Sequence, residues 1–154
     1  MSYQFLLRDI FAAAILAVSI TSNGLHASEV ENSKEEPLVL RQIMIALGKD
    51  MQTVTDAISR EDWVRVAETA SIIADHPQPP FTEKVRILAF VGSDAGRFKQ
   101  FDEQTHQAAT IMEQAAKRGN GQAVIKSFAT LQNSCLACHQ NYRKPFVEHF
   151  YVHH

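Results

Sequence analysis

The sequence predicts an all-α protein folded as an antiparallel four-helix bundle. Four segments carry apolar residues at steps of three and four, the spacing that places them along one side of a helix. Turn-forming residues separate the first segment from the second and the third from the fourth, so helices adjacent in sequence should run antiparallel. No segment shows the alternating pattern of a strand. A chain of 154 residues is long enough for one domain with a substantial core.

The composition is that of an ordinary globular protein. Charged residues make up 21%, hydrophobic residues 45%, and the formal net charge is −2. Lysine and arginine are scattered and form no stripe with interleaved aromatic residues, which argues against nucleic acid as a partner.

The N-terminus predicts a secretory signal peptide over residues 1–27. Arg8 precedes an apolar run over 10–20, and Leu25-His26-Ala27 then resembles a cleavage site after Ala27. An uncleaved membrane anchor is the alternative, but the run is well short of the roughly 20 apolar residues that a spanning helix needs. We therefore expect an exported protein with no stable membrane span in the mature chain, beginning with a polar leader over 28–36.

The first helix is expected to begin near Pro37 and to continue for about six turns. This spacing places Met44 on the apolar stripe and turns Ile45 about 100° away from it. The stripe consists of Leu40, Met44, Leu47, Met51, Val54 and Ile58.

The second helix is expected to begin at Ser59, which forms a capping-box pattern with Asp62 three residues later. The proline-rich segment over 76–80 should end it. A less regular connection over 81–96 follows, with a short helical piece over 85–91. The apolar face of the second helix consists of Trp63, Val66, Ala67, Ala70, Ile73 and Ala74.

The third helix is expected over 94–118 and should end at Gly119-Asn120-Gly121, whose residues tolerate positive φ. The fourth follows at once and should end at or before Lys144 because Pro145 comes next. The bundle domain is thus predicted over 37–145, with an apolar tail over 146–154 that packs back on it. The third stripe contains Phe98, Phe101, Thr105, Ala108, Met112 and Ala115, and the fourth Val124, Phe128, Leu131, Cys135, Cys138 and Tyr142.

The segment Cys135-Leu136-Ala137-Cys138-His139 has the spacing of a c-type haem attachment site. Two thiols three residues apart lie on one side of a helix, so both can form thioethers with one porphyrin. His139 is then placed to bind the iron. A redox dithiol or half of a zinc site is the alternative, but a thioredoxin-like motif expects a βαβ context, and a closed zinc site needs four ligands.

The chain resembles the class II c-type cytochromes, which include cytochrome c′ and its low-spin, six-coordinate relatives. The resemblance rests on the segments 133–143 (NSCLACHQNYR) and 41–49 (RQIMIALGK). It implies a four-helix bundle enclosing one covalently attached haem c, carried by Cys135 and Cys138, with His139 as proximal iron ligand. Arg143 matches a family arginine close to the haem, although a solvated cation at a helix end is an equal alternative. Because haem is attached outside the cytoplasm in bacteria, the resemblance also implies a periplasmic protein.

The sixth iron position decides between two functions. In the six-coordinate relatives a methionine of the first helix binds the iron, and Met44 is the candidate here. The family's distal residue usually lies four after the arginine, however, and four after Arg41 is Ile45. Met44, Met51 and Met112 could also all be core residues, the usual role of methionine on an apolar stripe.

With Met44 bound, the protein is expected to transfer electrons between redox partners and to be no enzyme. With Ile45 at the iron, it is expected to bind nitric oxide or carbon monoxide. Pairing of two copies through the first two helices, common in the family, is a further expectation. His106, off the apolar stripe, is expected to be exposed. Surface positions, or at most an adventitious metal site, are expected for His76 in the proline turn and for the tail histidines His149, His153 and His154.

Overall fold

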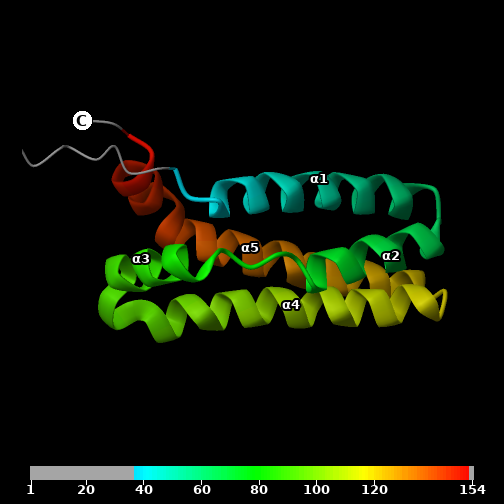
Figure 1. Ribbon diagram of the computed structural model, residues 1–154. Helices are drawn as coiled ribbons and strands as arrows, with labels where there is room; N and C mark the ends of the chain where they lie inside the picture. Colours follow the sequence, from blue (N-terminus) through cyan, green and yellow to red (C-terminus); the bar gives the residue numbers. More distant parts are fainter. Residues whose placement is uncertain (1–36, 153–154) are drawn as a thin grey trace, which may run out of the picture. The chain divides into compact units, whose positions relative to one another are not determined.

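The structure, a computed structural model, describes residues 37–152. The predicted signal peptide and leader (1–36) and the last two residues lie outside the described residues. The described part is all-α, as predicted, and has no strand. Four helices form the bundle and a shorter one lies in the connection between the second and third (Figure 1). Their bounds are α1 (Leu40–Ser59), α2 (Trp63–Ala74), α3 (Phe81–Val91), α4 (Ala95–Lys117) and α5 (Gly121–Phe150), with a single 3-10 turn, η1 (Gly92–Asp94), before α4.

Helix α4 packs against both α2 and α5, and α1 packs against α2. The α1–α2 and α4–α5 turns lie at the same end of the bundle, which we call the turn end (Figure 1). Trp63 at the start of α2 lies directly against Gly121 at the start of α5. A Cβ atom at position 121 would lie 3.0 Å from two carbon atoms of the indole ring, so any larger residue would have to push the ring aside. Gly119, with φ of 62°, ends α4 in a conformation that glycine adopts without strain.

Helices α2 and α5 begin with side-chain caps. The Asp62 carboxylate accepts a hydrogen bond of 3.0 Å from the Arg65 amide, and the Asn120 side chain accepts one of 3.0 Å from the Ala123 amide. The predicted cap at Ser59 is wrong: its hydroxyl donates to the Thr55 carbonyl and belongs to the last turn of α1. Ser59 and Asp62 both suit an N-cap, and the length of α1 decides between them.

The buried apolar residues form two clusters. The first core cluster is built from all four bundle helices. The second joins the start of α1, helix α3 and the end of α5. The first consists of Val54, Ala57, Val66, Ala67, Ala70, Ile73, Ala108, Ala109, Met112, Ala115, Ala116, Val124 and Leu131, and the second of Leu38, Ile87, Tyr142, Phe146 and Phe150.

Helix α5 continues through Pro145 to Phe150, so the predicted end at Lys144 is wrong. Proline at this position removes the hydrogen bond to the Asn141 carbonyl and costs about 3 kcal/mol. Phe146 and Phe150 are each 5% exposed, and burial of such side chains contributes about 1.5–3 kcal/mol apiece. Packing of the predicted tail on the bundle therefore offsets the proline, and the last turns run at an angle to the rest of α5 (Figure 1).

Candidate functional site

The two cysteines lie at the boundary between the two core clusters. Cys135 is half-buried against the first core cluster, and Cys138, one turn later on α5, is half-buried against the second. Between the helices at this level, the Thr105 hydroxyl of α4 donates to the Ser134 hydroxyl at 3.2 Å. The thiols are free and lie in one unbroken stretch of helix, as attachment to a single porphyrin requires.

Both thiols are held in the neutral form. Burial raises the pKa of Cys135. Burial, and secondarily the charges of Asp102 and Cys135, raise the pKa of Cys138 to about 11. A thioether carries no charge, so these surroundings suit sulfur bonded to carbon better than a thiolate.

His139 and Arg143 lie one turn apart on the exposed side of α5. Loss of solvent around the imidazole, and then the positive charge of Arg143, lower the pKa of His139. A neutral imidazole has a lone pair available for a metal ion. Arg143 therefore acts on the predicted ligand through its charge.

Tyr142 adds a polar atom near the motif that the protein leaves without a partner. Its ring is buried and makes edge contacts with Phe98 and Phe101. Its hydroxyl is buried and has no hydrogen-bond partner among the described residues. A buried hydroxyl without a partner, beside half-buried thiols, fits a site that holds a bound group which the described residues do not supply.

At the start of α1 the buried position is Ile43, which is 6% exposed, whereas Met44 is 39% and Ile45 44% exposed. The predicted stripe is therefore wrong at this turn, where α1 buries Ile43 in place of Met44. Met112 is fully buried in the first core cluster, where it fills space. Iron binding by Met44 stays a prediction.

Met44 and the cysteine motif lie at the same height in the bundle. The end of α1 and the start of α5 are both at the turn end, so heights can be compared from there (Figure 1). At 1.5 Å per residue, Met44 lies about 22 Å along α1 from Ser59. Cys135 and His139 lie about 21 and 27 Å along α5 from Gly121. A group carried by the motif is thus level with Met44 and Ile45.

A family model described as Cytochrome C′ matches residues 41–143. The chain belongs to the cytochrome c′ family. No curated protein and no solved structure gives a significant match to it.

Membership of the cytochrome c′ family makes this a c-type haem protein. The described residues fit haem c: two neutral thiols and a neutral imidazole on one helix supply the donor set that this cofactor needs. The orphaned Tyr142 hydroxyl lies one turn beyond.

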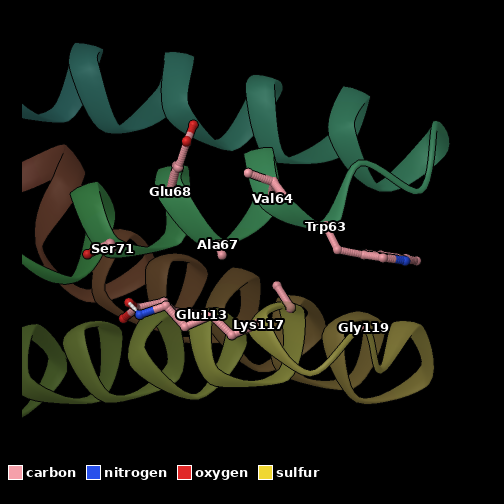
Figure 2. Close-up of a pocket in the computed structure, with 9 residues that line it drawn as sticks. Trp63, Val64, Ala67, Glu68, Ser71, Glu113, Lys117 and Gly119 are labelled. Atoms are coloured by element: carbon pink, nitrogen blue, oxygen red, sulfur yellow. Dashed lines mark hydrogen bonds and ion pairs between the residues drawn. The ribbon is translucent and has the colours of Figure 1, made fainter.

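A hollow between α2 and α4 is distinct from the predicted haem site of this cytochrome c′ family member. It measures about 630 Å³ and lies near the turn end, with the Glu113–Lys117 ion pair on one wall (Figure 2). Its lining contains no residue of α5, which carries the cysteine motif, so the hollow is a separate feature from the predicted haem site. Its lining consists of Trp63, Val64, Ala67, Glu68, Ser71, Glu113, Ala116, Lys117 and Gly119.

Two of the histidines expected to be exposed lie inside the fold. His76 is 8% exposed, and its ring stacks on that of His106 with centroids 4.6 Å apart. His106 is half-buried, so the prediction was wrong for both. The tertiary structure brings the end of α2 against the middle of α4, a contact that periodicity does not encode. His149 is exposed as predicted, although its ring stacks on Phe90.

Among residues 37–152, no helix combines the length and the apolar character needed to cross a membrane. The apolar run over 10–20 lies outside the described residues.

Proposed function

We propose that this cytochrome c′ family member is a periplasmic monohaem protein that transfers electrons and has no enzymatic activity. Cys135 and Cys138 would hold the haem through two thioethers, and His139 and Met44 would be the axial ligands. The observation that supports this most is the common height of Met44 on α1 and the cysteine motif on α5.

Haem c, when bound, supplies a one-electron iron couple. The residues of the chain set its surroundings. His139 offers a neutral imidazole, and the thioether of Met44 would raise the potential relative to a second histidine. The two apolar clusters that meet at the motif disfavour the more highly charged ferric state and raise the potential further.

Arg143 is proposed to lie close to the haem. It follows His139 by one turn and already lowers the pKa of that imidazole. In this position its guanidinium would pair with a propionate or reduce the basicity of the ligand.

Gas binding is the second candidate function. The exposure of residues at the start of α1 does not favour Met44 over Ile45 as the residue that faces the iron. Met44 and Ile45 are almost equally exposed, at 39% and 44%. If Ile45 covers the iron, no thioether reaches it, and nitric oxide or carbon monoxide would bind the free position.

Optical and electron paramagnetic resonance spectra of the purified ferric protein test the choice. A low-spin signal with a sulfur-to-iron band, and no spectral shift when the ferrous protein meets carbon monoxide, is expected for electron transfer. A high-spin signal with prompt carbon monoxide binding would contradict electron transfer and support gas binding. No covalently retained Soret chromophore at all would refute both.

The location and partners are proposed on chemical grounds. The predicted signal peptide and the need for haem attachment outside the cytoplasm support the periplasm. Redox proteins are the expected partners, and pairing of two copies stays a prediction.

A further inference from the structure

A cluster of two histidines and one aspartate lies between the end of α2 and the middle of α4. His76 follows α2 directly, and Asp102 and His106 lie one turn apart on α4. One ligand atom from each of the three side chains can be chosen so that all lie within 4.8 Å of one another. None of these residues belongs to the predicted haem ligands.

Backbone carbonyls fix both imidazole rings. Nδ1 of His76 lies 3.0 Å from the Ile73 carbonyl oxygen, and Nδ1 of His106 is hydrogen-bonded to the Ala74 carbonyl oxygen. A carbonyl oxygen only accepts, so each Nδ1 must carry the proton. In each neutral ring Nε2 is then left with a lone pair.

Both Nε2 atoms face the same carboxylate. That of His76 lies 3.7 Å from Oδ1 of Asp102, and that of His106 lies 3.5 Å from Oδ2. Two nitrogen lone pairs, on rings that stack 14° from parallel, therefore lie beside one carboxylate, and without a proton or a metal ion among these acceptors the arrangement is unfavourable. Ring nitrogens held by a backbone carbonyl on the far side are the usual form of metal-binding histidine.

The distances suit a small divalent metal ion. Tetrahedral zinc with bonds of about 2.0–2.1 Å separates neighbouring ligand atoms by about 3.3 Å. The two nitrogen-to-oxygen distances, 3.7 Å to Oδ1 and 3.5 Å to Oδ2, exceed this by a few tenths of an ångström, and the whole ligand set spans up to 4.8 Å, so the two imidazole rings would draw together on binding. The His76 side chain is 6% exposed and Asp102 43%, so an ion could enter from the solvent side of the carboxylate.

We propose that His76, Asp102 and His106 bind one Zn²⁺ ion through two Nε2 atoms and a carboxylate oxygen, with water as the fourth ligand. The ion neutralises the convergent acceptors and ties the end of α2 to α4, at the point where the proline-rich segment leaves the helix. The site shares no residue with the proposed haem ligands, although the charge of Asp102 also acts on Cys138.

Calorimetric titration of Zn²⁺ into the chelator-treated, haem-loaded protein tests the site. Haem attachment occupies the thiols and His139, which removes them as competing ligands. We expect one ion per chain, and at least about a tenfold loss of affinity in Asp102→Asn and in His106→Gln. These replacements are preferred to a change at buried His76, and circular dichroism verifies that each variant is folded.

The matched control replaces the terminal histidines, His149, His153 and His154, with alanine together. The ion should still bind with unchanged affinity. Zinc-edge X-ray absorption, which does not detect iron, should show two imidazole ligands at about 2.0 Å. Absence of binding in the unaltered protein, or binding that only the terminal triple variant removes, would overturn the proposal. If the unaltered protein binds no Zn²⁺, protons on the histidines would be all that offsets the Asp102 charge.

Discussion

At the scale of single residues, Met44 distinguishes the two candidate functions. Met44→Ala should open the iron to carbon monoxide and lower the reduction potential while the haem stays attached, because a thioether ligand would be lost. Carbon monoxide binding should rise from undetectable to one molecule per haem, as followed in the Soret region.

Ile45→Ala is the matched control for Met44, since it removes a neighbouring apolar side chain of similar exposure. It should leave the low-spin spectrum intact. If Met44→Ala changes neither spectrum nor potential, Met44 is no ligand.

Tyr142 gives a pH-dependent prediction. Burial, and then the charge of Asp94, raise the pKa of this phenol above its ordinary value of 10.0. A group whose pKa is raised in the folded state contributes stability that is present below its unfolded value and lost as pH rises beyond it. Tyr142→Phe should therefore lose less stability than the unaltered protein above pH 10.

The same variant should stay within about 1 kcal/mol of the original at pH 7, because the deleted hydroxyl has no partner among the described residues. Tyr151→Phe is the control: this half-buried phenol interacts with the Arg41 backbone, so about 1 kcal/mol should be lost. Urea unfolding at pH 7 and above pH 10 measures the free energy of unfolding of each variant. A larger loss in Tyr142→Phe would mean that its hydroxyl is hydrogen-bonded in the haem-loaded protein.

At the scale of helices, Glu83 of α3 holds the start of α1. Its carboxylate is 6% exposed and accepts hydrogen bonds from the Val39 amide at 2.6 Å and the Leu40 amide at 2.8 Å. Helix α1 has no side-chain cap of its own. The negative charge at this helix N-terminus is also favourable to the helix dipole.

Glu83→Ala should lower the free energy of unfolding by about 2–3 kcal/mol, because two partly buried amides at the start of α1 would lose a charged acceptor. Glu83→Gln, which keeps one acceptor, should lose less. Chemical denaturation checks both, with Glu103→Gln on the exposed side of α4 as control. Equal stability of Glu83→Ala and the control would contradict this role.

The helices also show where local signals mislead. The four-three spacing predicted all four bundle helices, and their bounds differ by at most four residues from those observed, except at the end of α5. Pro145 predicted the end of the fourth helix because the loss of a backbone hydrogen bond at proline is evident from the sequence. The packing of Phe146 and Phe150 that offsets this loss depends on tertiary contacts.

At the scale of the whole molecule, the cysteine motif links the two core clusters, so haem attachment and stability should be coupled. Cys138→Ala should impair covalent haem retention and lower the melting temperature, because a large apolar group would be held less firmly where the clusters meet. Haem staining after denaturing electrophoresis and thermal melting measure the two effects.

Gly48→Ala provides a control for that experiment. A Cβ atom at this exposed position of α1 meets no atom within 4 Å, and alanine favours a helix, so haem content should be unchanged and stability slightly higher. A Cys138→Ala variant as stable and as fully loaded with haem as the original would refute the assignment.

The sequence by itself determined the helical periodicity and the Cys135-to-His139 spacing, because both are local patterns that a single helix imposes. It could not decide which neighbour of Met44 is buried, since a helix with apolar residues at 43, 44 and 45 can turn any of them inward. Only the tertiary structure placed Glu83 at α1 and His76 against Asp102 and His106, because these contacts join residues more than twenty positions apart.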